Sequence, residues 1–498
     1  MKPDQNISYQ IPHGVQASFQ GRSTFLSTPQ GGKVLVDRRV LDLWQKADQA
    51  QLDTVINRLS AQGYAKTALC AGLACLCQAG LLERYPENKA TRVSPAVEGP
   101  LVSVVIVSYN SRPWLAECLA SLASQSYPAQ EIILVDNHSS DDTVAWTSAN
   151  YPDIPLIQHE QTVSLAQAIN SGIQAAQGAY FLLLNPDVRL EPDALSILVQ
   201  TAQSEPIAAA VAAKLKLDWA PGFLNGIGNL VGAFGFGTDI GLGCLDLGQC
   251  DRLTRLPSAC FAAALVSRQA WQEVGSLDSA FPLYYEDSEW CYRARLLGYS
   301  VLAAPKAIVY HAFGSRTPAS QDAGISAVRL QRVVYGRLRF AGKLLSNRYQ
   351  RMFMNRYLLE DTLRFIFAAI RLRGSQAKAI WQGRRQFSRA DDLAEARQAV
   401  QKNRKVTDEE LLGLQKNLPA PLIWRGLPIL TWDTIQSVYT PLILSGQTIP
   451  LPEFPEGYQP QHAVPSKLQR GKQIYQDEGA GMLLHRLYRA IQRRLAQP

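Results

Sequence analysis

Three short apolar runs, each ending abruptly in polar residues, constrain the fold of this chain more than any other feature. The runs are VSVVIVSYN, EIILVDNHSSDD and AYFLLLNPD. The polar residues that end them are Tyr109, Asn110, Asp136, Asn137, Asn185, Pro186 and Asp187. Apolar runs of this length, separated by segments with helical spacing, indicate buried parallel strands of an α/β sheet. Because ligands of such sheets bind beyond the carboxyl ends of the strands, two strand-end aspartates suggest a nucleotide and a metal ion.

Length and composition allow several folded domains that favour anionic partners. The 498 residues are 47% hydrophobic and 18% charged, so sizeable cores can form and wholesale disorder is not expected. The formal net charge of +8 favours phosphate groups, an acidic membrane surface or nucleic acid. The eight cysteines have no paired spacing, which is typical of free thiols in a reducing cytosol.

Neither a secretory signal nor a membrane span is expected. The first ten residues are polar and contain no apolar core. The most apolar stretches, 68–82 and 352–372, are too short or interrupted by charged residues, whereas a span needs roughly 18 uninterrupted apolar residues. We therefore expect a cytoplasmic protein, soluble or peripheral on the inner face of the plasma membrane.

Composition divides the chain into four consecutive segments. Residues 1–84 contain two strand-like pieces and three helical patterns, and 85–100 form a linker rich in Pro, Glu, Asn and Lys. Residues 101–315 alternate strand and helix patterns. Residues 316–498 are helical and basic, with a Pro-rich interruption and a last basic amphipathic helix at 482–495.

Six blocks within residues 100–314 resemble glycosyltransferase family 2, most closely its rhamnosyltransferase-like bacterial branch. They are VSVVIVSYNS, CLASL, EIILVDNHSSDD, AINSGIQAAQGAYFLLLNPD, EVGSLDSAFPLYYEDSEWCYRARLLGY and VYHAFGS. Six blocks in order are a more specific signal than any single motif. The resemblance implies an α/β GT-A fold, Rossmann-like with a mixed, mostly parallel sheet, and inverting transfer of a sugar from a nucleotide donor.

The resemblance assigns a metal ion to Asp187 and His311. Asp187 closes an apolar strand, and hard oxygen ligands suit Mg²⁺ or Mn²⁺, which neutralise the charge of a leaving diphosphate. His311, in VYHAFGS, matches a family histidine that ligates the metal or meets the diphosphate. The alternatives are a plain turn after the strand for Asn185–Asp187 and a structural hydrogen-bonding role for His311.

The nucleotide is assigned to the ends of the first two strands. By resemblance Asp136 binds the pyrimidine base, because a carboxylate can accept a hydrogen bond from its imino N–H. Tyr109 would lie against the base or ribose, and Asn137 is assigned to the nucleotide as well. The alternatives are an Asx-turn or N-cap role with Ser139 and Ser140 for Asp136, and a core position at the strand end for Tyr109.

The acidic pair that follows FPLYY is assigned to catalysis. Asp287 matches the catalytic base of the family, and Glu286 is assigned to orienting the acceptor. Two adjacent carboxylates beside apolar residues support this, since desolvation raises a carboxyl pKa toward useful basicity. A routine helix cap is the alternative. Arg293 or Arg295, further along the predicted helix, is expected to reach a phosphate, with plain solvent exposure as the equal alternative.

Two segments limit what the resemblance says about the substrates. Thr162, Ser164, Leu165 and Ala166 stand where the family branch usually has Asn and Gly-Phe-Ala. That loop normally helps to hold the nucleotide, so the donor stays open among dTDP- and UDP-sugars, dTDP-rhamnose included. The Gly-rich segment 226–243 does not join a strand to a helix, and we interpret it as an acceptor-side loop or a flexible insert.

The flanking segments carry weaker patterns. KVLVDRRVLDLW, LDTVINRLSAQ and CLCQAGLLERY resemble a small α+β PqqD-like winged-helix domain, which implies peptide binding; packing on the catalytic unit is the alternative. Nucleic acid is not expected as a partner, because the helical segment 65–82 carries only Lys66. The C-terminal helices interleave Arg and Lys with apolar residues, which is typical of an anionic membrane interface or of a packed helical layer.

These patterns together predict a metal-dependent, inverting glycosyltransferase. It would move a sugar from a nucleotide-sugar donor to a saccharide or lipid-linked acceptor in cell-surface polysaccharide, cell-wall or glycolipid assembly. A transferase acting on a peptide held by the N-terminal domain is one alternative, and a non-catalytic nucleotide-sugar-binding scaffold is another. A processive synthase is not expected, because no QxxRW sequence is present.

Overall fold

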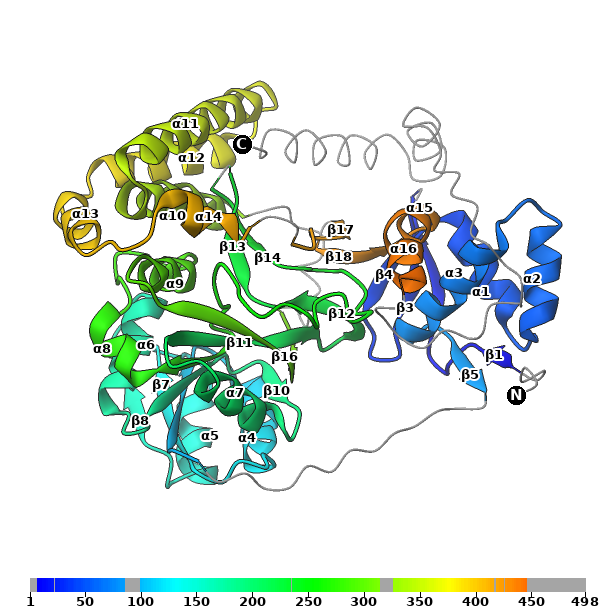
Figure 1. Ribbon diagram of the computed structural model, residues 1–498, viewed down its shortest axis with the longest axis horizontal. Helices are drawn as coiled ribbons and strands as arrows, with labels where there is room; N and C mark the ends of the chain where they lie inside the picture. Colours follow the sequence, from blue (N-terminus) through cyan, green and yellow to red (C-terminus); the bar gives the residue numbers. More distant parts are fainter. Residues whose placement is uncertain are drawn as a thin grey trace.

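Three units make up the structure in Figure 1: an α/β unit, a small N-terminal unit beside it, and a layer of C-terminal helices. This computed structural model describes residues 7–21, 23–85, 99–233, 235–313, 326–415, 418–424 and 426–445. The predicted linker and the predicted last helix at 482–495 fall largely or wholly outside the described residues.

A nine-stranded mixed sheet organises the α/β unit. Its strands are β6 (Val102–Ser108), β7 (Gln130–Asp136), β8 (Leu156–Gln158), β9 (Tyr180–Leu184), β10 (Val188–Leu190), β11 (Ala208–Leu217), β12 (Ala220–Gly226), β15 (Ala263–Ser267) and β16 (Ser300–His311). They follow the order β10-β16-β11-β15-β9-β6-β7-β8, and β12 pairs with β11. Strands β9, β6, β7 and β8 are parallel to one another, whereas β15 runs antiparallel between β9 and β11. The predicted mixed, mostly parallel arrangement is confirmed.

Helices cover both faces of this sheet, which is why its strands are apolar throughout. They are α4 (Arg112–Ala123), α5 (Thr143–Asn150), α6 (Leu165–Ala175), α7 (Ala194–Gln203), α8 (Arg268–Val274) and α9 (Glu286–Leu296). Ile169, Trp271 and Trp290 from α6, α8 and α9 join the core on one face. Leu119 and Leu198 from α4 and α7 join the core on the other.

The strand register brings the predicted polar residues to one edge of the sheet. Ser108 pairs with Asp136 at the ends of β6 and β7, and β9 runs beside β6 in the same direction. At the far side of the sheet β10 is antiparallel to β16, with Val188 opposite His311. Residues that follow β6, β7 and β9 therefore meet the end of β16 along this edge.

The N-terminal unit combines both ends of the described chain. Its elements are β1 (Ser8–Gln10), β2 (Ala17–Gln20), β3 (Ser23–Ser27), β4 (Lys33–Val36), α1 (Arg38–Ala47), α2 (Leu52–Ser60), α3 (Lys66–Gln78) and β5 (Glu83–Tyr85). Residues after 418 add β17 (Ile423–Trp424), β18 (Leu427–Leu430), α15 (Trp432–Thr434), the π-helix η2 (Ile435–Tyr439) and α16 (Thr440–Leu444). Strand β18 runs parallel to β4, and β17 pairs with β18, so the two strands together extend the sheet to five. The predicted division into consecutive segments did not include this pairing of residues after 418 with the N-terminal unit.

Apolar contacts fix the N-terminal unit to the α/β unit. Leu217, Phe223 and Leu245 belong to the same core as the helices of the N-terminal unit. Gln78 donates from Nε2 to the backbone oxygen of Asp246 at 2.9 Å. Gly222 lies so close to α3 that a Cβ atom there would stand 2.2 Å from the Gln78 carbonyl oxygen. The two units therefore form one packed body.

The C-terminal helices pack over α9. They are α10 (Ala327–Leu344), α11 (Asn347–Ile370), α12 (Gly374–Ser388), α13 (Leu393–Lys402) and α14 (Asp408–Gly413). On α10 the buried Arg337 pairs with Asp361 of α11, and the buried Arg339 pairs with Asp278 at 3.0 Å. Among the residues that the structure describes, no helix is both long and apolar enough to cross a membrane.

Asp37 tests the joining of the two chain ends. Its buried carboxylate accepts from Val40 N at 2.9 Å, which caps α1, and from Trp432 N at 2.8 Å. Replacing Asp37 by Ala leaves both N–H groups without this partner, and we expect a loss of about 2–4 kcal/mol of unfolding free energy, measured by urea titration. The exposed Asp53 is the control: Asp53→Ala should cost less than about 1 kcal/mol. Equal losses in the two variants would contradict the role of Asp37.

Candidate active site

A cavity of about 460 Å³ opens between the polar edge of the sheet and the start of α9. The residues around it come from β6, α6 and β9 on one side, from α9 and β16 on another, and from α10. The acidic, basic and amide side chains among them are Asn185, Asn229, Asp239, Glu286, Asp287, His311 and Arg329. The cavity thus contacts the acidic pair assigned to catalysis and, of the residues assigned to the donor and metal, His311, whereas Tyr109, Asp136, Asn137 and Asp187 do not line it.

A strained turn aims the acidic pair into this cavity. Tyr284 and Tyr285, just before α9, have φ values of 70° and 71°, a left-handed conformation that is unfavourable for bulky residues. The buried Tyr285 hydroxyl donates to Gly235 O at 2.6 Å and accepts from Gly237 N at 3.3 Å. Its ring leaves no room for a side chain at Gly336, where a Cβ would lie 2.5 Å away. Packing on both sides holds the turn in place.

Asp287 is held by two side chains and one backbone group. Asn229 donates from Nδ2 to Asp287 Oδ2 at 2.7 Å, and Ser288 N donates to Oδ1 at 2.6 Å. The Ser288 hydroxyl in turn donates to Asn229 Oδ1 at 3.0 Å. Burial raises the pKa of Asp287, although the Ser288 N–H and the Asn229 amide oppose this by favouring the carboxylate. The result is an oriented carboxylate of increased basicity.

Glu286 and Asp239 add two further carboxyl groups to the same cavity. Burial, with the charge of Asp287, raises the pKa of Glu286 to about 8. The same causes raise the pKa of Asp239 to about 7, against the opposing charges of His311 and Arg329. Glu286 Oε2 has no hydrogen-bond partner among the described residues. Near neutral pH Glu286 is therefore protonated and can donate a hydrogen bond into the cavity.

Asp239 was not predicted as a site residue. It ends β14 (Gly237–Asp239), which forms a hairpin with β13 (Asn229–Val231) and pairs Asp239 with Asn229. The sequence interpretation treated 226–243 as an acceptor-side loop or a flexible insert, because this Gly-rich segment does not join a strand to a helix. In the sequence, Asp239 is a lone acidic residue in a segment of glycines and apolar residues. The Asp287 side chain comes near it only when the hairpin folds over α9.

Asp187 and His311 lie side by side across the β10–β16 pair. His311 Nε2 is 3.2 Å from Asp187 Oδ1, and Nδ1 is 2.6 Å from Asn225 Oδ1. Because an amide oxygen and a carboxylate oxygen both accept hydrogen bonds, each ring nitrogen of His311 faces an acceptor, Asn225 at Nδ1 and Asp187 at Nε2. Burial raises the pKa of Asp187, but the hydrogen bond and charge of His311 outweigh it and hold that pKa below its ordinary value.

This Asp–His pair fits a divalent cation as a two-ligand site. One oxygen and one imidazole nitrogen converge, and the second ring nitrogen is fixed by Asn225, as is usual for a metal-binding histidine. Among the described residues no group of three or more His, Cys, Asp or Glu side chains is placed to hold a metal. The remaining ligands would therefore have to come from diphosphate and water.

The residues assigned to the nucleotide have three different environments. Tyr109 is 54% exposed beyond β6, so its ring face is open to a ligand. Both oxygens of the buried Asp136 accept from Ser139, from its N–H at 2.9 Å and from its hydroxyl at 2.5 Å, as the Asx-turn alternative requires. Asn137 donates to Val163 O at 3.1 Å and accepts from Val163 N at 2.9 Å, so it fixes the loop before α6.

Arg293 lies outside the cavity, and its assignment to phosphate finds no support in this geometry. Its guanidinium bonds Glu289 at 2.9 Å and the carbonyl oxygens of Val274 and Ser276 at 2.5 and 2.8 Å. Arg295 is buried and donates to the backbone of Pro257 and Leu411. Both arginines of α9 join the helix to neighbouring segments, because the cavity lies at the other end of the helix.

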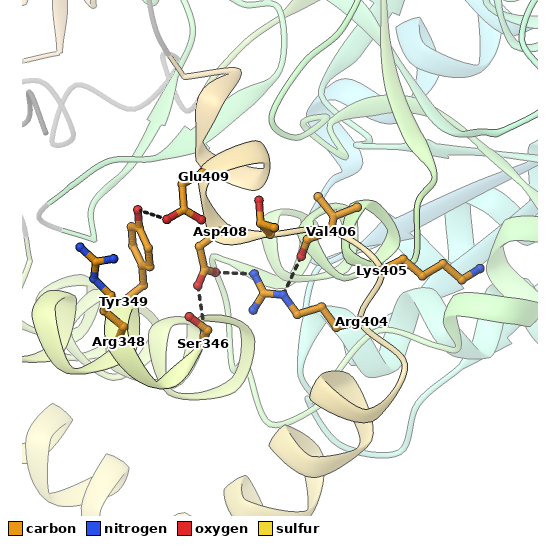
Figure 2. Close-up of a pocket in the computed structure, with 9 residues that line it drawn as sticks. Ser346, Arg348, Tyr349, Arg404, Lys405, Val406, Asp408 and Glu409 are labelled. Atoms are coloured by element: carbon orange, nitrogen blue, oxygen red, sulfur yellow. Dashed lines mark hydrogen bonds and ion pairs between the residues drawn. The ribbon is translucent and has the colours of Figure 1, made fainter.

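A second hollow, between α11 and α14, is crossed by contacts that join its walls. Figure 2 shows Arg404 joined to Asp408 and Tyr349 joined to Glu409. Arg404 Nη2 lies 2.6 Å from Asp408 Oδ1, and the Tyr349 hydroxyl donates to Glu409 Oε1 at 2.9 Å. Ser346 N also donates to Asp408, at 3.1 Å. These contacts join helices, and we assign no chemistry to this hollow.

Comparison with known families identifies the α/β unit. Residues 103–237 match the family model described as Glycosyl transferase family 2. The unit is thus a glycosyltransferase family 2 domain, and its mixed sheet with helices on both faces is the predicted GT-A fold. The matched residues include Asp136, Asp187 and the hairpin residue Asn229, whereas Asp287 and His311 follow them in the chain. The rhamnosyltransferase-like branch and the PqqD-like domain stay predictions.

Individual relatives match over part of the chain. The chain is 39% identical over 118 residues to Uncharacterized protein y4gI of Sinorhizobium fredii, which is 23% of this chain and 13% of that protein. It is 32% identical over 108 residues to Glycosyltransferase GlyG of Streptococcus pneumoniae, covering 21% and 36%. It is 24% identical over 234 residues to Poly-beta-1,6-N-acetyl-D-glucosamine synthase of Staphylococcus epidermidis, covering 46% and 54%. The chain therefore spans about half or less of these relatives.

A solved structure of GalNAc-T7 with UDP, GalNAc and Mn²⁺ also resembles the chain. The identity is 16%, the TM-score is 0.44, and the likeness covers 63% of this chain and 56% of that one. A superposition this loose says nothing about substrate or metal.

The raised pKa of Glu286 predicts how stability depends on pH. Between its ordinary value of 4.5 and about 8, the folded state holds this proton and the unfolded state does not. The stability from the protonated group is therefore complete below about pH 4.5 and is lost as the pH rises through about 8. We expect the Tm of Glu286→Gln to fall less between about pH 5 and 8 than that of wild type. Asp153 is exposed, so Asp153→Asn is the control and should show the same change of Tm with pH as wild type. If Glu286→Gln also shows the wild-type change of Tm with pH, the raised pKa of Glu286 is refuted.

Proposed function

We propose that the protein is an inverting glycosyltransferase that uses a nucleotide-sugar donor. The observation that carries this proposal is the single cavity that joins the oriented Asp287 carboxylate to the sheet edge with Asn185 and His311. The family 2 match over residues 103–237 supports the same class of reaction. Saccharide or lipid-linked acceptors in polysaccharide or glycolipid assembly are the substrates we propose.

Asp287 is proposed as the general base. Inverting transfer requires a group that takes the proton of the acceptor hydroxyl on the face of the sugar opposite to the leaving diphosphate. The Asn229 and Ser288 hydrogen bonds fix the direction of the carboxylate, and its raised pKa brings it closer to neutral pH. Glu286, protonated beside it, would hold the acceptor by a hydrogen bond without competing for the same proton.

Asp187 and His311 are proposed to hold Mg²⁺ or Mn²⁺. A divalent ion there supplies charge neutralisation for the departing diphosphate. The chain's own contribution is to fix the two ligands: β10–β16 pairing places them, and Asn225 orients the imidazole. Tyr109 is proposed to stack on the base of the donor, and Asp136, through Ser139, to shape the loop that receives it.

The catalytic assignment is tested with nucleotide release from a panel of UDP-, dTDP- and GDP-sugars. We expect one donor to release its nucleotide, and Asp287→Asn to lower that rate at least about a hundredfold with donor binding retained. Asp153→Asn is the control and should keep the wild-type rate. Donor binding without release, even with saccharide, lipid-linked or peptide acceptors supplied, would instead indicate a non-catalytic scaffold.

The metal assignment has a test that does not need turnover. Titration of Mn²⁺ followed by electron paramagnetic resonance, in the presence of the nucleotide, should show binding to the wild-type chain. Loss of one of the two proposed protein ligands should weaken Mn²⁺ binding at least about tenfold in Asp187→Asn and in His311→Ala. Asn225→Ala should weaken it less, because the ring remains but its orientation is free. Unchanged Mn²⁺ affinity in both ligand variants would rule out this site.

A further inference from the structure

One face of α11 leaves large apolar side chains in solvent. Leu359, Leu363 and Ile370 are 62, 58 and 73% exposed, and Leu372 just beyond the helix is 92% exposed. We define the α11 apolar face as Leu359, Leu363, Ile366, Phe367, Ile370 and Leu372. Residues 359, 363, 366 and 370 follow helical spacing and so lie along one side of the helix. A contiguous apolar stripe of this kind indicates an interaction surface.

The rest of α11 is fixed, so the stripe cannot turn inward. Phe353, Tyr357 and Ala368 are buried on the side that faces the neighbouring helices. The buried Asp361 pairs with Arg337 of α10, and Glu360 pairs with the same guanidinium at 2.9 Å. Rotation of the helix would break these buried ion pairs.

Positive charge surrounds the α11 apolar face. Residues 347–389 contain ten arginines and lysines but only two acids, an excess of eight that equals the net charge of the whole chain. Both acids, Glu360 and Asp361, are paired with arginines. Arg371 lies 4.1 Å from the ring centre of the exposed Phe367, and Arg385 lies 4.9 Å from that of the exposed Trp381. The rim is therefore cationic and rich in aromatic rings.

We propose that the α11 apolar face docks on an anionic lipid surface. An apolar stripe with arginines at its border matches the boundary between acyl chains and negatively charged headgroups. Self-association through the same face would bring two such cationic regions together and is disfavoured by their repulsion. The helix would lie in the interface and not cross it.

The docking surface is linked to the cavity by direct contacts. Arg364 of α11 lies 4.7 Å from the ring centre of Phe236, and Arg337 lies 4.5 Å from the same ring. Phe236 lines the catalytic cavity, as do Arg329 and Leu330 of α10. This link deepens the proposed function and rests on it: a lipid-linked acceptor held in the bilayer would lie beside the cavity.

Vesicle co-sedimentation of the full chain tests the docking. The probes are vesicles of phosphatidylcholine alone and of phosphatidylcholine mixed with phosphatidylglycerol. The wild-type chain should bind the mixed vesicles and not the neutral ones. Leu363→Gln with Ile370→Gln should weaken this binding at least about tenfold, because two apolar side chains no longer enter the acyl region. Ile207→Gln, at a 48% exposed position on the α/β unit, is the matched control and should bind as wild type.

A second variant separates charge from apolar burial. The double variant Arg371→Gln with Arg373→Gln should bind the mixed vesicles more weakly, by about fivefold for each arginine removed. Added salt should lower the affinity of the wild-type chain for these vesicles toward that of the double variant. Nucleotide release without vesicles should be unchanged in all these variants, so a failed transferase assay and failed docking remain distinguishable. The docking is overturned by the absence of wild-type binding to mixed vesicles or by wild-type binding in both double variants. It is also overturned if light scattering shows that the face is buried in an oligomer.

Discussion

The hydrogen bond between Asn229 and Asp287 joins the two segments on which the site depends. Asn229 is the first residue of the β13–β14 hairpin, and Asp287 is the second residue of α9. The same two segments meet again where the Tyr285 hydroxyl bonds Gly235 and Gly237 at the hairpin turn. Two strained tyrosine backbones are tolerated only because these contacts and the packing of α10 hold them. The hairpin, α9 and α10 thus form one support for the acidic cavity.

Electrostatics divides the cavity into two functional sides. Three carboxyl groups on the hairpin and α9 cannot all be charged in a buried site, so their protons are shared unequally. Asp287 accepts hydrogen bonds from Asn229 and Ser288 that stabilise its charged form, whereas Glu286 Oε2 has no partner among the described residues and Glu286 keeps its proton. On the sheet side, Asp187 stays charged because His311 lies beside it. One side can therefore accept and donate protons while the other is suited to a cation and phosphate.

Local patterns predicted the sheet well and the site in part. The three apolar runs quoted from the sequence coincide with β6, β7 and β9, because continuous apolar runs depend on residues that are neighbours in the chain. Asp287, Glu286, Asp187 and His311 meet one cavity or its border, since strand ends and a helix start are readable from sequence. Asp239 and the true contacts of Arg293 were not predictable, because they depend on how a hairpin and helices fold over the sheet. The pairing of β18 with β4 was missed for the same reason.

That pairing has a consequence for how the protein is made. The N-terminal unit is synthesised before the α/β unit, yet its sheet and core need β18 and Trp432, which are synthesised nearly four hundred residues later. Until then one edge of β4, which contains the apolar Val34 and Val36, has no partner strand. Such an open edge can pair with strands of other chains. Closing so long a loop is slow compared with local folding. The N-terminal unit is therefore completed only after the α/β unit and the C-terminal helices have been synthesised.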